Sequence, residues 1–229
     1  MPVPCKIKKV ISTIHNTPSP YTNPQEDVRL IAVTKTQSVD VIKEAVDYGL
    51  RDLGENRVQE ILEKYPHFSQ DVRWHLIGHL QTNKVKYIID KVYMIHSLDS
   101  LKLAAEIQKR AAQIDRVIPC LVQLNIADED TKFGLAKEEA EPFLREVCRL
   151  PNIEIQGLMT IGPHVDDKEK IRGVFRELRQ LKDYLATLAL PGVKMRELSM
   201  GMSNDYIVAI QEGATMVRVG SSIFGARSN

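Results

Sequence analysis

A lysine that ends an apolar run is the first residue in this sequence to indicate chemistry. Lys35 closes the segment RLIAVTK (residues 29–35), which is apolar on both faces apart from its ends. A lysine held at the dry end of a buried strand is disfavoured in its charged form, which lowers its pKa and makes its amine a better nucleophile. Such an amine can form a Schiff base with a carbonyl compound. The alternative interpretation is a lysine whose ammonium group reaches solvent from a strand end.

A second group of residues near the C-terminus is typical of an anion site. Gly220, Ser221 and Ser222 follow the apolar run MVRV and precede a short expected helix, Ser222–Gly225. Backbone amides of such a loop bind phosphate without any side-chain charge, and the hydroxyls of Ser221 and Ser203 offer further hydrogen bonds. A serine that merely caps a helix is the simpler alternative.

Arg218 precedes Gly220 by two positions, so in a strand both residues point to the same side. We therefore expect Arg218 to face the proposed phosphate site, although a structural ion pair is the commoner role of a single arginine. The two histidines of HLIGH, His75 and His79, have a spacing that suits a metal only on a helix. Because this pair spans an expected strand and turn, we predict no metal site.

The elements that position these residues follow an alternating pattern. From residue 29 to the end, short apolar runs alternate with segments of helical periodicity, which predicts a parallel sheet covered by helices. Eight strands favour closure into a single (β/α)8 TIM barrel over an open α/β sheet. We expect the strands at residues 29–35, 53–56, 72–78, 92–97, 117–125, 153–161, 196–202 and 216–220.

In this fold the working face lies where the strands end. Polar residues at the expected strand ends include Lys35, Glu55, Asn56, His75, His79, Ser97, Asn125, Thr160, Ser199, Ser203, Arg218 and Ser222. No shift in composition marks a second domain, so we expect one domain over residues 1–229. Residues 1–28 are expected to form a short N-terminal helix and a loop rich in Pro and Asn (residues 16–25).

Composition excludes several classes of protein. The 229 residues include 31 basic and 30 acidic side chains and carry a formal net charge of +1, unlike the basic surface of a nucleic-acid-binding protein. Three cysteines without metal-like spacing suggest a reducing, cytoplasmic location. The N-terminus lacks the features of a secretory signal, and no apolar run reaches the roughly 20 residues that span a membrane.

Seven motifs in order resemble the pyridoxal phosphate homeostasis protein family, also called the YggS/PROSC family. The resemblance covers residues 29–227, whereas the loop at residues 16–25 departs from the family pattern, in which a helix leads almost directly into the first strand. The motifs are AVTK (32–35), GENRVQE (54–60), WHLIGHLQTNK (74–84), NIADEDTKFG (125–134), GLMTI (157–161), LSMGMSNDY (198–206) and GATMVRVGSSIFGAR (213–227).

The resemblance implies a barrel of the alanine racemase N-terminal domain type that binds pyridoxal 5′-phosphate (PLP). It implies a Schiff base between PLP and Lys35, with Asn56 beside the ring and its phenolic oxygen. It also implies contact between Arg218 and the pyridine nitrogen. Ser203, Gly220 and Ser221 would hold the phosphate, next to a wall formed by Met200, Gly201 and Met202.

The same assignment favours a carrier over an enzyme. An arginine beside the pyridine nitrogen disfavours its protonation, which makes the ring a weaker electron sink. Racemisation also needs acid–base groups on both faces of the substrate, and no motif supplies a second base. We therefore expect no catalytic residue. Because the expected single domain lacks the second domain that forms the usual dimer interface of alanine racemase, we also expect a monomer, with apo forms of PLP-dependent enzymes as possible partners. The alternatives are a PLP-dependent racemase or lyase, and an aldolase-like enzyme that uses Lys35 without a cofactor.

Overall fold

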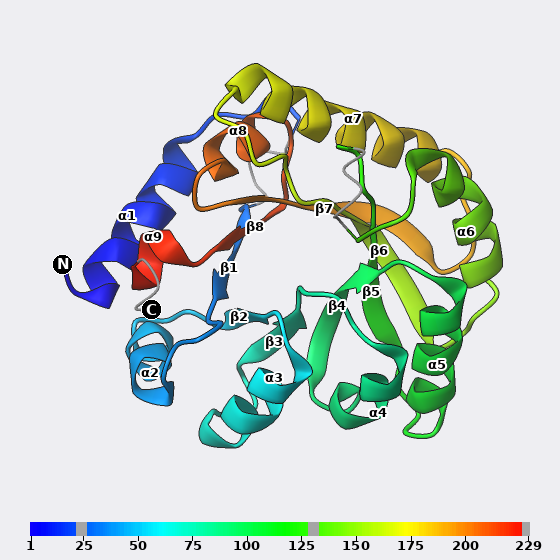
Figure 1. The fold of residues 1–229 in the computed structure, drawn as a ribbon, viewed down its shortest axis with the longest axis horizontal. Coiled ribbons are helices and arrows are strands. Elements are labelled where there is room, and N and C mark those ends of the chain that lie inside the picture. Colours follow the sequence, from blue (N-terminus) through cyan, green and yellow to red (C-terminus); the bar gives the residue numbers. More distant parts are fainter. Residues whose placement is uncertain (22–26, 128–132, 226–229) are drawn as a thin grey trace.

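A closed barrel of parallel strands forms the centre of the molecule. The computed structural model describes residues 1–21, 27–127 and 133–225. Within these ranges the strands follow one another in chain order, and β8 closes the barrel against β1 (Figure 1). The strands are β1 (Arg29–Val33), β2 (Asp52–Glu55), β3 (Arg73–Leu76), β4 (Val92–Leu98), β5 (Ile118–Gln123), β6 (Ile153–Met159), β7 (Val193–Met202) and β8 (Met216–Val219).

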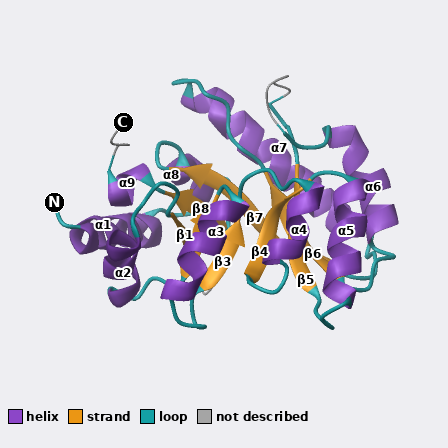
Figure 2. Cartoon of the chain, turned by 60° about the horizontal axis from the view of Figure 1, so that its bottom comes forward, coloured by secondary structure: helices purple, strands orange, loops and turns teal. Residues whose placement is uncertain are grey.

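Helices follow the strands and lie around the outside of the barrel (Figure 2). The α-helices are α1 (Val3–Asn16), α2 (Val39–Asp47), α3 (Val58–Lys64), α4 (Val85–Ile88), α5 (Leu101–Ala112), α6 (Ala140–Val147), α7 (Lys168–Ala186), α8 (Tyr206–Gln211) and α9 (Ser221–Phe224). The described residues also form three short 3-10 helices: η1 (Tyr65–His67), η2 (Thr82–Lys84) and η3 (Lys137–Glu139). The (β/α)8 barrel predicted from the sequence is thereby confirmed.

Every strand contributes apolar side chains to a core outside the barrel, and five of the strands also contribute to a second apolar cluster. The larger core fills the space between the barrel wall and the helices and contains the fully buried side chains of Trp74 and Phe175. The smaller apolar cluster lies apart from it and takes one residue from each of five strands. That cluster contains Ile31, Met94, Leu121, Met159 and Met216.

The longest helix forms as its sequence predicts. Asp167 caps the start of α7, where its carboxylate accepts hydrogen bonds from the backbone N–H groups of Glu169 and Lys170. The sequence has an apolar stripe with helical spacing, and all of its residues except Val174 are buried. The stripe consists of Ile171, Val174, Phe175, Leu178, Leu181 and Leu185. The stripe holds α7 against the outside of the barrel, where it contacts β7.

All eight predicted strands are present, with changed bounds. β1 ends at Val33, so Lys35 lies in the turn that follows rather than in the strand itself. β7 begins at Val193, three residues before the expected start, and α9 begins at Ser221 instead of Ser222. The predicted loop at residues 16–25 lies partly outside the described residues.

The N-terminal segment forms a regular helix. α1 has 14 residues and buries Ile7, Val10 and Ile14. It lies beside α9, so the two ends of the described chain are neighbours (Figure 1). Within the described part of the chain, every helix is too short or too polar to cross a lipid bilayer.

Candidate functional site

Lys35 and Asn56 come together at the carboxyl end of the barrel. Val33 of β1 is in register with Gly54 of β2. Lys35 lies two residues after Val33, and Asn56 lies two residues after Gly54. Both side chains are half-buried. Because parallel strands run in the same direction, the register brings both residues to the same edge.

An ion cluster behind β1 and β2 holds the turn that contains Lys35. The ammonium group of Lys64 donates hydrogen bonds to the Thr34 carbonyl at 2.8 Å, to Glu55 Oε1 at 2.7 Å and to Glu60 Oε2 at 2.9 Å. Lys64 ends α3 and is only 5% exposed. A buried ammonium group must be fully paired, and here it has three acceptors.

The same cluster fixes both neighbours of Lys35. The Thr34 hydroxyl donates to Glu55 Oε1 at 2.5 Å, and Glu60 Oε2 accepts from the Thr36 backbone N–H at 2.7 Å. Thr36 has a φ of 64°, in the left-handed region that a threonine adopts only when its surroundings enforce it. The turn is therefore held in one conformation from both sides of Lys35.

Burial raises the pKa of Glu55 to about 7, although the hydrogen bonds from Lys64 and Thr34 oppose this change. Glu55 is among the polar residues that the sequence places at strand ends, without a specific role, and the sequence patterns did not single out Glu60 or Lys64. The four-residue spacing of Glu60 and Lys64 on α3 indicates an ion pair, since residues with this spacing meet on one face of a helix.

Ser203, Gly220 and Ser222 form a small group of hydrogen-bond donors. The backbone N–H groups of Gly220 and Ser222 both donate to Ser203 Oγ, at 3.2 and 3.3 Å. Two main-chain donors thus converge on one oxygen position. An added Cβ on Gly220 would lie 3.2 Å from the Val33 carbonyl, so glycine lets this loop approach β1 closely. Ser221, the first residue of α9, is exposed.

The end of β7 contains the three predicted wall residues, which have different surroundings. Gly201 has a φ of 91°, and a Cβ added to it would lie 2.5 Å from the Cβ of Ala209. Met200 is fully buried in the larger core, whereas Met202 is half-buried. The Met202 backbone N–H donates to the carboxylate of Asp205, which holds the turn after the strand.

Arg218 is buried among neutral hydrogen-bond acceptors. Its Nη1 donates to Ser199 Oγ at 2.6 Å and its Nη2 to the Thr160 carbonyl at 2.9 Å. None of the ion pairs between described residues includes Arg218, which disfavours the structural ion pair weighed as its alternative role. Burial lowers the pKa of Arg218 to about 10, against the opposing charge of Asp205, so the guanidinium keeps its charge at neutral pH.

The two histidines of HLIGH have separate partners. His75 lies buried between Asp52 and His96, whereas His79 lies 3.4 Å from the carboxylate of Asp99. The described residues contain no cluster of three or more histidine, cysteine or acidic side chains that could hold a metal ion. The contacts of His75 could not be predicted from the sequence, because they depend on residues far away along the chain.

Comparisons with known proteins identify the family of the chain. A family model described as "Alanine racemase, N-terminal domain" matches residues 18–228. A relative from Aquifex aeolicus, named pyridoxal phosphate homeostasis protein, is 47% identical over 203 residues that make up 87% of each chain. A relative of the same name from Synechocystis is 38% identical over 205 residues, covering 87% of this chain and 92% of its own.

Solved structures give the same result for the fold. PipY from Synechococcus elongatus with PLP bound superposes with a TM-score of 0.85 at 31% identity, over 97% of this chain and 100% of PipY. An alanine racemase from Clostridium difficile gives a TM-score of 0.78 at 17% identity, and the match spans 57% of the racemase. At this identity the racemase is evidence for the fold and not for the function. It confirms the predicted type of barrel.

Proposed function

The chain contains the alanine racemase N-terminal domain and belongs to the pyridoxal phosphate homeostasis protein family, and on that premise we propose that it binds PLP through Lys35. In this proposal PLP forms a Schiff base with the lysine amine, and the protein buffers or delivers PLP without transforming amino acids. The observation that carries the proposal is that a lysine in a fixed turn, two converging main-chain donors and a buried arginine belong to neighbouring strands of one barrel.

The donor set fits the chemical groups of PLP. An amine is needed for its aldehyde, and the half-buried Lys35 follows β1 where the barrel opens. The phosphate needs hydrogen-bond donors, which the backbone N–H groups of Gly220 and Ser222 and the hydroxyl of Ser203 supply. We assign further phosphate contacts to Ser221, the neighbourhood of the ring to Asn56, and the nearby wall to Met200, Gly201 and Met202.

Arg218 is proposed to face the pyridine nitrogen of PLP. Its guanidinium remains charged at neutral pH, and two adjacent cations repel each other. The pyridine nitrogen is therefore kept unprotonated, which reduces the power of the ring to stabilise a carbanion. A site of this kind retains PLP but is a poor catalyst of reactions at the α-carbon of an amino acid.

The names of the relatives support a carrier, since they describe homeostasis and not an enzymatic reaction. We also propose that the chain acts as a single domain and a monomer in the cytoplasm, and that apo forms of PLP-dependent enzymes receive the cofactor. The racemase or lyase alternative requires a second acid–base group opposite Lys35, for which we assign no residue.

An absorbance titration with PLP tests the proposal. After removal of unbound PLP, we expect the parent protein to be yellow and the Lys35→Arg variant to be colourless. The matched control is Lys137→Arg, which changes an exposed lysine paired with Glu177 and should bind like the parent protein. A parent protein that is colourless after saturation with PLP and removal of the unbound cofactor would contradict binding through an imine.

A transfer assay tests the carrier role separately. The PLP-loaded protein, freed of unbound PLP, should restore activity to an apo aminotransferase. Rapid turnover of an amino acid by the loaded protein, lost in the Lys35→Arg variant, would instead establish an enzyme and refute the carrier role.

A further inference from the structure

A continuous chain of side-chain hydrogen bonds crosses the inside of the barrel. Asp52 Oδ1 lies 2.8 Å from His75 Nε2, and His75 Nδ1 lies 2.9 Å from His96 Nε2. His96 Nδ1 lies 2.9 Å from Ser199 Oγ, which accepts from Arg218 Nη1 at 2.6 Å. We call these five residues the interior chain. All of them are buried, and they come from five different strands.

The two ends of the interior chain fix the direction of every hydrogen bond in it. A guanidinium only donates, so Ser199 accepts from Arg218 and its single proton goes to His96 Nδ1. His96 must then carry its proton on Nε2 and donate to His75 Nδ1. His75 in turn carries its proton on Nε2 and donates to Asp52, whose carboxylate only accepts. The chain thus runs one way, from a cation to an anion.

Electrostatic interactions favour the protonation states that these hydrogen bonds require. Burial lowers the pKa of both histidines, and for His96 the positive charge of Arg218 adds to the effect. Burial opposes the ionisation of Asp52, but hydrogen bonds from His75 and Arg73 outweigh it and hold the pKa of Asp52 below its usual range. Both imidazoles are therefore neutral and Asp52 is charged at neutral pH.

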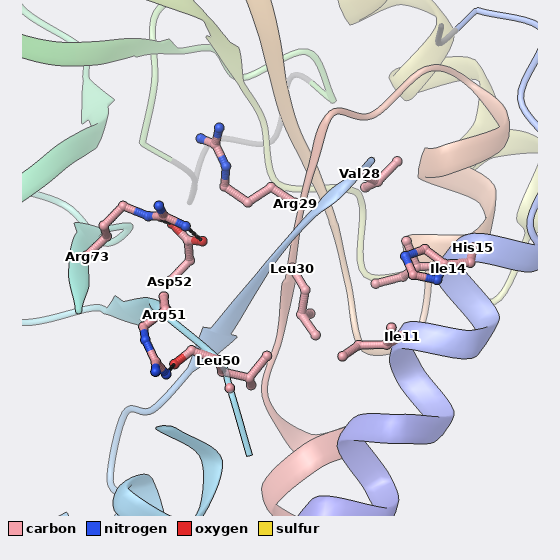
Figure 3. A pocket seen from close by; sticks show the side chains of 11 residues that line it. Ile11, Ile14, His15, Val28, Arg29, Leu30, Leu50, Arg51, Asp52 and Arg73 are labelled. Atoms are coloured by element: carbon pink, nitrogen blue, oxygen red, sulfur yellow. Dashed lines mark hydrogen bonds and ion pairs between the residues drawn. The ribbon is translucent and has the colours of Figure 1, made fainter. Parts of the chain in front are cut away.

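The far end of the interior chain lies at the opposite end of the barrel from Lys35. Asp52 is the first residue of β2, and Arg73, the first residue of β3, donates to both of its oxygens. Both residues line a cavity of about 290 Å³ beside α1. In Figure 3 the side chains of Asp52 and Arg73 lie on one side of this cavity and those of Ile11 and Ile14 on the other.

Arg218 needs such support because it is a buried cation. Its two acceptors, Ser199 Oγ and the Thr160 carbonyl, are neutral. An acceptor that is itself polarised toward a carboxylate binds a cation more strongly, since hydrogen bonds in series reinforce one another. A hydroxyl that donates to His96 is also fixed in orientation, which restricts the guanidinium to one position.

We propose that Ser199, His96, His75 and Asp52 are positioning residues that hold the Arg218 guanidinium for contact with the bound cofactor. The proposal rests on the proposed binding of PLP at the barrel mouth. It makes the affinity for PLP depend on Asp52, a residue at the other end of the barrel.

A double-mutant cycle on the dissociation constant (Kd) for PLP tests this coupling. We expect Ser199→Ala to raise Kd about tenfold, close to the loss of one hydrogen bond to a charged group, and Asp52→Asn to raise it about threefold, which is in the range of a neutral hydrogen bond. The double variant should bind no more weakly than Ser199→Ala, because either change interrupts the same chain. Effects on Kd that multiply, or an Asp52→Asn variant that binds like the parent, would overturn the proposal.

Glu212→Gln is the matched control. Glu212 is a buried carboxylate outside the interior chain, 3.1 Å from Arg172, and its replacement should lower thermal stability without changing Kd. Thermal unfolding of each variant without PLP shows whether it folds. A parent protein that fails to bind PLP would refute the proposed function, whereas normal parent binding with an unaffected Asp52→Asn variant refutes only the coupling.

A second readout does not need the cofactor. Long-range proton–nitrogen NMR correlations of the PLP-free protein distinguish the two neutral forms of histidine from imidazolium. We expect His75 and His96 both to be neutral with the proton on Nε2 at pH 7. A proton on Nδ1 of either ring, or a charged imidazolium, would show that the chain does not run from Arg218 to Asp52.

Discussion

Replacement of Lys64 by methionine tests the cluster that holds the turn containing Lys35. Met has nearly the length of Lys, so the change removes the charge while keeping most of the packing. It deletes three hydrogen bonds, to Thr34, Glu55 and Glu60, and leaves the fully buried Glu55 without its cation. Removal of one partner from a buried ion pair costs about 3–5 kcal/mol, and we expect a loss of this size at pH 8.

The loss should depend on pH. Burial raises the pKa of Glu55 to about 7, so its contribution to stability is present at low pH and falls as the pH rises toward that value. Without Lys64 the pKa of Glu55 rises further, and the folded variant must keep Glu55 protonated at pH 8, where the parent does not. The loss of stability should therefore be about 1 kcal/mol larger at pH 8 than at pH 6.

Urea unfolding of the PLP-free protein at both pH values measures these differences. The double variant Lys64→Met/Glu55→Gln should recover more than half of the loss at pH 8, because no buried carboxylate remains unpaired. Lys137→Met is the control, since it removes an exposed ion pair with Glu177 and should have a much smaller effect. A Lys64→Met variant less than about 1 kcal/mol below the parent, or a double variant no more stable than the single one, would refute this account of the cluster.

Three further substitutions have defined outcomes. Gly201→Ala should destabilise the protein in urea unfolding by about 3 kcal/mol, because φ is 91° and the new Cβ meets Ala209, whereas Gly173→Ala in α7, with open space around it, should be neutral or stabilising. Ser203→Ala should raise the Kd for PLP about tenfold in an absorbance titration, with little change in the melting temperature (Tm) of the PLP-free protein; equal losses in both would indicate a structural role. Asp167→Ala should lower the free energy of unfolding by about 1 kcal/mol, since it removes the cap of α7, and an unchanged value would contradict that role.

The sequence predicted the parts of the fold that depend on local patterns. Eight apolar runs gave the eight strands, and the apolar stripe of α7 gave its buried face. The same pattern placed Lys35 and Gly220 at strand ends, because chain direction alone decides which edge of a parallel sheet they reach. Bounds were less accurate, since a strand ends where its neighbours stop pairing and not where its apolar run stops.

The interior chain was beyond prediction because its contacts are long-range. Ser199 lies 103 residues from His96, and their hydrogen bond exists only once the strands have closed into a barrel. Register shifts at Trp74/His75 and at Ser199/Met202 also decide which side chains meet. A register shift by one residue moves the side chains of a strand to the opposite face of the sheet, and the local sequence does not specify where such a shift occurs.

The ion cluster was missed for a different reason. Glu60 and Lys64 have the spacing of an ordinary exposed helix pair, so the sequence alone does not indicate that they are buried. Their burial follows from the contact of α3 with β2, which places Lys64 over the end of the strand beside Glu55. Because Glu60 and Lys64 lie at the end of this strand, they hold the turn that contains Lys35.

The attachment point of the cofactor is the most direct test of the central claim. The PLP-loaded protein is reduced with borohydride, digested and mapped by mass spectrometry. We expect one modified peptide, with reduced pyridoxyl phosphate on Lys35. An adduct on another lysine, or a digest without any adduct after saturation with PLP, would contradict the claim that Lys35 holds the cofactor.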